Sequence, residues 1–264
     1  MNTTAYLARI GLLPDHLEPN EEVLRLIQRK HLLSVPFENL DIHWERPIVL
    51  DVNRFFEKIV TNRRGGFCYE LNGLFNELLR SIGYQTRLLS ARVFNGTDYG
   101  PEFDHALIVV TIGDDEYLTD VGFGDFTAEP LRFSLAVEQH DPAGIFVVRR
   151  FDDEYFEVAK RDGNSWKSQY IFKDIARELV DFTEMCDFQQ YSPDSHFKKG
   201  KVCSILTENG RKTLTDKKFI VSTAVGDKKE SEAGDEKFDL LLITEFRIDA
   251  RKFGDKSLKE AEVP

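Results

Sequence analysis

The chain has 264 residues, 46 of them acidic and 35 basic, a formal net charge of −11 and a hydrophobic content of 41%. The length suffices for one large core or several small ones, and this composition is typical of a soluble globular protein. Because phosphate binding needs clustered lysine and arginine, the acidic balance argues against a nucleic-acid partner. With no basic-then-apolar leader and no run of about 18 apolar residues, we expect a cytoplasmic protein without a membrane partner.

The first 83 residues show the three- and four-residue apolar spacing of helices. Asn20 is suited to cap one helix and Asp51 a second. A third helix is predicted to begin at Cys68 and to end at Gly83, a common stop signal. Its apolar positions are Leu71, Leu74, Phe75, Leu78, Leu79 and Ile82.

Cys68 follows Gly65, Gly66 and Phe67 and lies on the first turn of this predicted helix. The free N–H groups of a first turn carry partial positive charge, which favours thiolate over thiol and predicts a lowered pKa. The two glycines let the backbone pass close to the sulfur and leave room for a substrate. The motif therefore predicts a nucleophilic cysteine, whereas a lone cysteine is more often an inert core residue.

From Tyr84 onward the spacing changes to that of strands punctuated by Gly, Asn and Asp, which predicts an antiparallel meander or barrel. The predicted strands are 84–94, 105–112, 116–123, 144–149, 154–158 and 165–172. A helix at 174–189, strands at 201–207 and 218–224, an exposed charged loop at 227–237 and an apolar segment at 240–246 are predicted to follow.

A nucleophilic cysteine needs a base. The candidates are His16, His31, His43, His105, His140 and His196. His105 opens the predicted strand 105–112, and a turn at 113–115 predicts a hairpin that brings Asp120 back near His105, with a register uncertain by two residues. Alone, a strand-end histidine and a strand-ending aspartate are ordinary structural residues. Together with Cys68 they predict a triad in which the carboxylate orients an imidazole that activates the thiol.

The other two cysteines lie in apolar stretches and are expected in the core: Cys186 in a predicted helix and Cys203 in a predicted strand. The wide cysteine spacing and the absence of Cys-x-x-Cys and His-Glu-x-x-His motifs predict no metal site.

Five segments, in order and at matching spacing between residue 1 and about 207, resemble the arylamine N-acetyltransferases. They are 6–11 (YLARIG), 35–41 (VPFENLD), 64–68 (RGGFC), 118–124 (LTDVGFG) and 202–206 (VCSIL). The glycine-glycine-aromatic-cysteine motif behind an upstream Pro-Phe-Glu-Asn is highly specific. The resemblance implies that Cys68 is the acetyl-accepting nucleophile, His105 its base and Asp120 the orienting acid.

The resemblance also implies an α+β fold with the core of papain-like cysteine enzymes. A helical bundle, residues 1–83, carries the cysteine. An antiparallel β-barrel with a connecting helix, residues 84–190, carries the histidine and aspartate, and an α/β lid spans 191–264. The active site is then expected in the cleft between the bundle and the barrel.

The implied chemistry is acetyl transfer from acetyl-CoA, a co-substrate, to an arylamine or arylhydrazine through a Cys68 thioester, with ping-pong kinetics. No glycine-rich phosphate loop is present, so CoA comes from the resemblance alone, in which Phe123 and Gly124 match the segment against the pantetheine arm. Phe37 matches a position near the acceptor, where its ring could stack on an arene. Arg64 is expected to pair with Glu38 or another acid.

Other enzymes share such a triad, so two further readings stay open. One is a cysteine hydrolase or transglutaminase-like enzyme, in which water or lysine completes the acyl transfer. The other is an amide synthase that closes macrolactams from a carrier-bound acyl chain. An intact Cys68, His105 and Asp120 set argues against a non-catalytic binding protein.

Overall fold

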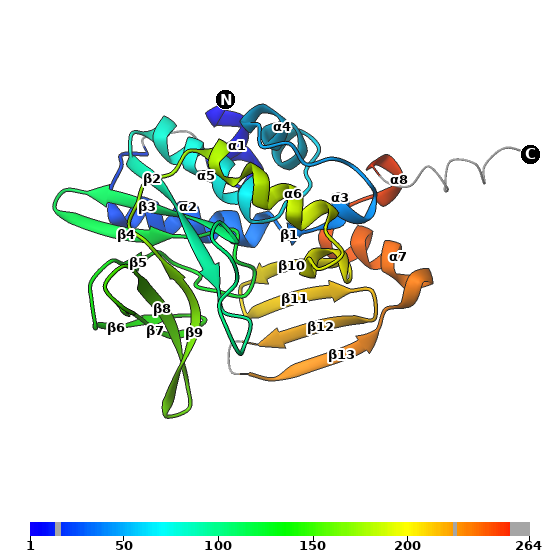
Figure 1. The fold of residues 1–264 in the computed structure, drawn as a ribbon. Coiled ribbons are helices and arrows are strands. Elements are labelled where there is room, and N and C mark those ends of the chain that lie inside the picture. The colour runs from blue at the N-terminus through cyan, green and yellow to red at the C-terminus, as the bar shows by residue number, and fades with distance from the viewer. Residues whose placement is uncertain (14–16, 224–225, 254–264) are drawn as a thin grey trace, which may run out of the picture.

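The computed structural model describes residues 1–13, 17–223 and 226–253. Helices occupy the N-terminal third, and two sheets lie beneath them, as Figure 1 shows. The early helices are α1 (Thr3–Arg9), α2 (Glu21–Ser34), α3 (Leu40–His43), α4 (Val52–Phe56), a π-helical turn (Glu57–Thr61) and α5 (Cys68–Ile82). The later ones are a 3₁₀ turn (Leu179–Phe182), α6 (Thr183–Tyr191), a 3₁₀ turn (His196–Lys198), α7 (Gly234–Phe246) and α8 (Ala250–Phe253). None of the described helices combines the length and apolar character needed to cross a membrane.

The helix boundaries follow local signals in the sequence. Asn20 accepts a hydrogen bond of 2.9 Å from the N–H of Val23, and Asp51 one of 2.9 Å from the N–H of Arg54, so both predicted caps are confirmed. The predicted helix beginning at Cys68 is also confirmed, and Gly83 ends it with a left-handed φ of 111°.

The larger sheet has eight strands in the order β5-β4-β3-β2-β9-β8-β7-β6, each antiparallel to its neighbours. Its strands are β2 (Gln85–Val93), β3 (His105–Ile112), β4 (Asp115–Thr119), β5 (Leu131–Arg132), β6 (Glu138–Asp141), β7 (Gly144–Arg150), β8 (Phe156–Asp162) and β9 (Ser165–Phe172). The side chain of Gln139 bridges the two edge strands, because its amide oxygen accepts from the N–H of Arg132 at 2.7 Å and its amide nitrogen donates to the Arg132 carbonyl at 2.8 Å. The sheet is a nearly closed barrel, as predicted.

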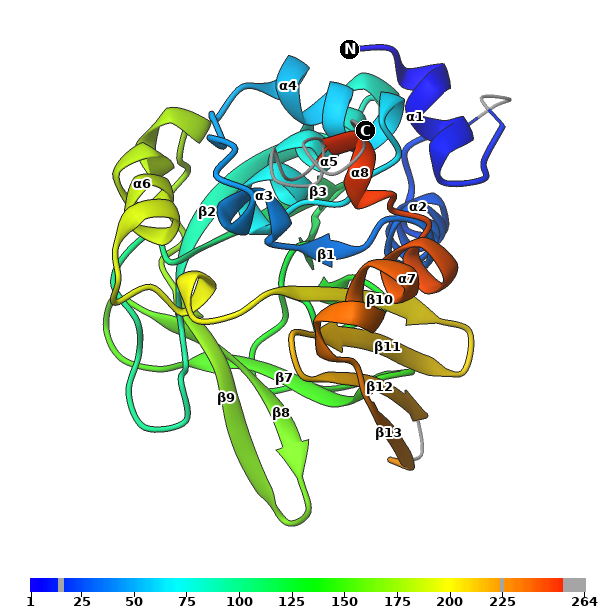
Figure 2. The ribbon, with the colours of Figure 1, turned by 90° about the vertical axis from the view of Figure 1, so that its right-hand side faces the viewer.

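The second sheet has five antiparallel strands in the order β1-β10-β11-β12-β13. They are β1 (Phe37–Glu38), β10 (Val202–Thr207), β11 (Gly210–Thr215), β12 (Lys218–Thr223) and β13 (Lys228–Glu232). α7 packs on β10 and β11, beside which it lies in Figure 2. β1 lies before the cysteine motif, whereas β10–β13 lie in the C-terminal part of the chain. This sheet therefore joins an N-terminal segment to a C-terminal one.

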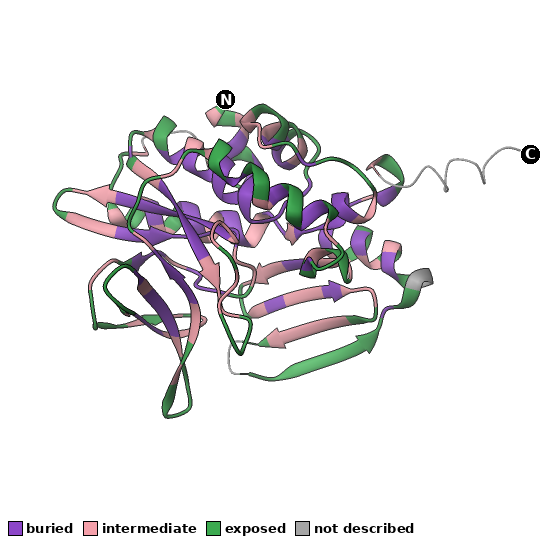
Figure 3. Ribbon diagram, viewed as in Figure 1, coloured by how far each residue is buried: buried purple, intermediate pink, exposed green. Residues whose placement is uncertain are grey.

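Two predictions for the C-terminal half are wrong in detail. The charged stretch 227–237 is not a loop, because β13 and the start of α7 lie within it. β13 is an edge strand held by backbone bonds to β12, so all its charged side chains stay in water (Figure 3). The helix predicted at 174–189 begins only with the 3₁₀ turn at Leu179.

α5 is largely buried. Eleven of its fifteen residues are buried, and the helix packs on β2 and β3 on one side and on α1 and α4 on the other. Purple therefore dominates the region between helices and barrel in Figure 3. A helix enclosed in this way has a fixed N-terminus, and Cys68 is its first residue.

Candidate active site

The predicted triad residues come from three different elements. Cys68 begins α5, His105 begins β3, and Asp120 directly follows β4. β3 and β4 pair antiparallel with Ile108 opposite Thr119, so the chain returning from the turn brings Asp120 back toward His105. Nε2 of His105 lies 2.7 Å from Oδ2 of Asp120, and both residues are buried.

This hydrogen bond decides which imidazole nitrogen is free. A carboxylate only accepts, so Nε2 of His105 carries the hydrogen and Nδ1 keeps its lone pair. Nδ1 has no hydrogen-bond partner among the described residues. Oδ1 of Asp120 accepts from the N–H of Gly122 and from Asn72, each at 2.9 Å, which holds the carboxylate in place.

The surroundings of the Cys68 thiol favour its protonated form. Burial raises its pKa well above the ordinary value, the Asp104 carboxylate raises the pKa further, and the backbone N–H of Ala106 opposes both. The prediction of a lowered pKa from the helix start is wrong, because lost hydration and a nearby negative charge outweigh the partial charge of the helix terminus. The site therefore needs a base to remove the proton.

Cys68 and His105 line one cavity of about 420 Å³. Its aromatic wall includes Phe37, Phe123 and Phe197, with Phe123 edge-on to the His105 ring at 5.2 Å between centroids. The polar residues around it are Asp104, Lys167, Ser168, Gln169, Gln189 and His196. Phe37 and Phe123 thus share the cavity with the thiol, whereas Gly124 is not among its lining residues.

The glycines around Cys68 allow tight backbone packing. A Cβ on Gly65 would come within 2.0 Å of the Pro36 carbonyl oxygen, and one on Gly66 within 2.9 Å of the Glu70 side chain. A Cβ on Gly122 would lie 2.8 Å from the Cα of Cys68. The glycines before the cysteine therefore press its loop against neighbouring segments, and Gly122 brings the barrel loop directly against the nucleophile.

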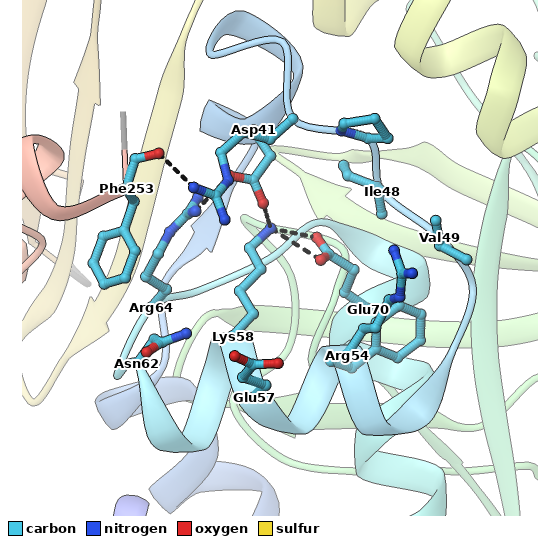
Figure 4. Close-up of a pocket in the computed structure, with 13 residues that line it drawn as sticks. Asp41, Ile48, Val49, Arg54, Glu57, Lys58, Asn62, Arg64, Glu70 and Phe253 are labelled. Carbon is cyan, nitrogen blue, oxygen red and sulfur yellow. Dashed lines mark hydrogen bonds and ion pairs between the residues drawn. The ribbon is translucent and has the colours of Figure 1, made fainter. Parts of the chain in front are cut away.

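A buried group of charges supports the loop before Cys68. Arg64 donates to Glu38 at 2.6 Å, which confirms the predicted pair, and also to Asp41. Figure 4 shows Lys58, from the π-helical turn, between Asp41 and Glu70: its Nζ donates to the two Glu70 oxygens at 2.9 and 2.8 Å and lies 2.8 Å from an Asp41 oxygen. All of these side chains except that of Glu38 border a second cavity of about 490 Å³.

Glu70 links this charge group to the nucleophile. Its Oε2 accepts from the N–H of Phe67 at 3.1 Å, directly before Cys68. Burial raises the pKa of Glu70 to about 7, with Lys58 acting in the opposite direction. The carboxyl group therefore titrates near neutral pH while it holds the first turn of α5.

The remaining candidate histidines have other surroundings. His31 is buried against Tyr6, and burial lowers its pKa to about 3. His43 contacts the Asn39 side chain and His140 lies in β6, whereas His196 lines the cavity of Cys68. His16 lies outside the described residues. Cys186 and Cys203 are buried, which confirms them as core residues.

Three polar residues of the site were not singled out from sequence as functional: Asn72, Asp104 and Gln189. For Asn72 a signal existed, because it lies four residues after Cys68, on the same face of α5, within an apolar stripe. No local pattern marks Asp104 or Gln189, since the second comes from a helix about 85 residues further along the chain.

Comparison with known proteins identifies the family of this chain. A sequence model described as N-acetyltransferase matches residues 21–253. The arylamine N-acetyltransferase / N-hydroxyarylamine O-acetyltransferase of Salmonella typhimurium is 34% identical over 218 residues, which cover 81% of this chain and 77% of that protein. These relatives do not favour the hydrolase, transglutaminase-like and amide-synthase readings.

Two solved structures are similar over nearly their whole length. The arylamine N-acetyltransferase from Salmonella typhimurium superposes with a TM-score of 0.90 at 29% identity, covering 99% of this chain and 97% of that one. The arylamine N-acetyltransferase of Mycobacterium marinum in complex with CoA gives a TM-score of 0.89 at 27% identity, covering 98% and 97%. The chain is therefore a member of the arylamine N-acetyltransferase family, enzymes whose general activity is acetyl transfer.

Proposed function

We propose that this enzyme transfers the acetyl group of acetyl-CoA to an arylamine or arylhydrazine nitrogen through a thioester on Cys68. One observation carries the proposal. The buried His105, whose Nε2 lies 2.7 Å from Oδ2 of Asp120, lines the same cavity as Cys68, and Cys68 is the only cysteine among the residues that line this cavity. The M. marinum relative bound to CoA supports acetyl-CoA as the donor.

In the first step His105 acts as the base. Its Nδ1 takes the proton of the Cys68 thiol while the sulfur attacks the acetyl carbonyl, because the raised pKa of this thiol leaves little thiolate beforehand. The bond from the carbonyl carbon to the CoA sulfur breaks, and His105 returns the proton to the leaving thiolate. Asp120 keeps the imidazole in the tautomer that this exchange requires.

In the second step the acceptor nitrogen attacks the thioester. His105 removes its proton, the carbon–sulfur bond to Cys68 breaks, and the amide is released. Phe37 and Phe123 offer ring faces for a flat acceptor or for the pantetheine arm. Gly124, with a left-handed φ of 93° and no atom within 4 Å of a Cβ placed on it, has open space beside it that would leave room for that arm.

The proposal also covers the organisation of the chain. We propose three structural units, 1–83, 84–190 and 191–264, arranged as in papain-like enzymes, with the last unit as a lid. The end of α5 at Ile82 and of α6 at Tyr191 supports these boundaries, although β1 joins the first unit to the sheet of the third. We further propose a cytoplasmic enzyme with a small-molecule acceptor, without metal or nucleic-acid partner.

Intact-mass spectrometry tests the thioester. The protein mixed with acetyl-CoA should gain one acetyl group, and an added arylamine should remove it and appear as the N-acetyl product. Cys68→Ala should gain nothing, whereas Cys186→Ala, the matched control in the core, should still be acetylated. Absence of an acetyl-enzyme with the unchanged protein, or acetylation of Cys68→Ala, contradicts the proposal.

A further inference from the structure

A carboxylate lines the cavity of Cys68, among phenylalanines and other polar side chains. Asp104 precedes His105 and lines the same cavity of about 420 Å³ as Cys68, His105 and the phenylalanines. Its side chain is half-buried, and among the described residues no lysine or arginine forms an ion pair with it. The triad does not use Asp104, because the hydrogen bond to His105 comes from Asp120.

The surrounding structure holds this carboxylate in place. Gln189 of α6 donates to Oδ1 of Asp104 at 2.8 Å, and the Gln189 amide is itself oriented because its oxygen accepts from the Ser195 hydroxyl at 2.7 Å. On the other side, a Cβ on Gly100 would come within 2.3 Å of Oδ2. A carboxylate has about four acceptor positions, so the bonds from Gln189 and from the Val93 N–H leave capacity for a ligand.

The charge of Asp104 disfavours the first step of the reaction, the acetylation of Cys68. It is the second cause, after burial, that raises the pKa of the Cys68 thiol, so it opposes formation of the thiolate. Burial raises the pKa of Asp104 itself, while His105, the Val93 backbone N–H, His196 and Gln189 act in the opposite direction. The remaining charged group around the cavity is the exposed Lys167.

The same charge can favour the second step, in which the acceptor amine attacks the thioester. The thioester is neutral, so the repulsion of a thiolate is gone, and the attacking nitrogen becomes positively charged as it bonds to the carbonyl carbon. An N–H group or a positive charge on the acceptor can then interact with Asp104, whereas a carboxylate on the acceptor would meet a like charge in a partly desolvated site.

We propose that Asp104 is a specificity-determining residue for the acceptor: it favours acceptors that carry an N–H donor or a positive charge and rejects acceptors that carry a carboxylate. This inference rests on the proposed function. It differs from repulsion by the net charge of −11, which acts at long range and is screened by salt.

The test compares acceptors that differ in charge on one ring. The values of kcat/KM are measured for p-toluidine, p-aminobenzoate and the 4-aminophenyltrimethylammonium ion with the unchanged enzyme, Asp104→Asn and Asp98→Asn. Asp98 is the matched control, because it lies in the same β2–β3 connection, is exposed and carries the same charge. Intrinsic differences in reactivity between the amines cancel when the kcat/KM of each variant is divided by that of the unchanged enzyme for the same amine.

For Asp104→Asn we expect the cation-to-anion ratio of kcat/KM to fall on the order of tenfold or more, since about 1.4 kcal/mol corresponds to tenfold. The fall should persist in about 0.5 M salt, where long-range repulsion is screened. Acylation by p-nitrophenyl acetate should become faster, not slower, because a charge that opposes the thiolate is removed. Asp98→Asn should change neither the ratio nor the acylation rate.

The outcomes separate this inference from the proposed function. An unchanged protein that acetyl-CoA does not acetylate at Cys68 overturns the function. An acetylated protein whose Asp104→Asn variant keeps the original acceptor ratio, or loses acylation and all acceptors equally as a structural residue would, overturns only the role of Asp104. Asp104→Ser provides the same measurement if the asparagine variant does not fold.

Discussion

The side-chain amide of Asn72 donates a hydrogen bond of 2.9 Å to Oδ1 of Asp120, the carboxylate whose other oxygen holds His105. The same amide nitrogen donates to the Ala106 carbonyl at 2.6 Å, and the Asn72 oxygen accepts from the N–H of Val121 at 2.9 Å. One side chain of the cysteine helix therefore ties α5 to β3 and to the end of β4. These contacts set how the nucleophile lies relative to its base.

Asn72→Ala should reduce acylation of Cys68 on the order of tenfold to a hundredfold and lower the free energy of unfolding by about 2 kcal/mol, because buried partners lose their hydrogen bonds. The control is Asn76→Ala, one turn further along α5 and equally buried, with no contact to the triad. Urea unfolding and burst kinetics measure both effects. Equal losses of acylation in the two variants would show that Asn72 acts through stability alone.

Asp120→Asn should lower the acylation rate on the order of 10³–10⁴, by analogy with triads in which the asparagine leaves the imidazole in the wrong tautomer. Asp115→Asn, at the turn end of the same hairpin and paired only with the exposed Arg132, should stay within a few-fold of the unchanged enzyme. Single-turnover kinetics with acetyl-CoA measure both. If Asp120→Asn lowered the acylation rate only a few-fold, the carboxylate of Asp120 would have no role in orienting His105.

Iodoacetamide should modify Cys68 alone, because this thiol lines a cavity whereas Cys186 and Cys203 are core residues. Since the pKa of Cys68 is raised, the rate should climb with pH through the alkaline range, without a plateau below pH 7 of the kind a stable thiolate would give. Prior acetyl-CoA should protect the thiol. Peptide mapping identifies the site, and a rate that is independent of pH near neutrality would contradict the raised pKa.

Glu70 should make stability depend on pH near neutrality. Its pKa is raised from 4.5 to about 7 in the folded protein, so its stabilising contribution is complete below pH 4.5 and is lost as pH rises through about 7. Glu70→Gln removes this titration while its amide oxygen can still accept from the Phe67 N–H. As the pH is lowered from about 8 to about 5, the Tm of the unchanged protein should therefore rise relative to that of Glu70→Gln.

The control for Glu70 is Glu77→Gln, on the same helix but paired with Arg80 at the surface. Its Tm should run parallel to that of the unchanged protein over the same pH range, as measured by differential scanning calorimetry. Parallel curves for Glu70→Gln as well would mean that the folded-state pKa of Glu70 is not raised.

Arylamines and arylhydrazides should be turned over faster than alkylamines such as a lysine peptide. Phe37 and Phe123 give a flat ring a surface to stack on, and alkylamines with a pKa around 10 have little free base near pH 7. Initial rates of CoA release with one acceptor of each kind measure this. A faster lysine peptide would favour the transglutaminase-like reading, and no acceleration by any amine would remove acetyl-CoA as the donor.

The sequence by itself determined the features that depend on near neighbours in the chain. The caps at Asn20 and Asp51 and the helix from Cys68 to Gly83 follow from side chains three or four residues apart. The strand alternation and the turn at 113–115 likewise placed Asp120 near His105, because a hairpin couples residues only about fifteen positions apart. The cysteine motif was also sufficient to indicate the family.

Only the tertiary structure decided the electrostatics of the site. The raised pKa of Cys68 depends on how completely the fold covers the sulfur and on the nearby charge of Asp104, whose position is set by Gln189 from α6. The contact of Asn72 with Asp120 spans 48 residues. Burial and charge proximity are sums over groups distant in the chain, so no local pattern of residues specifies them.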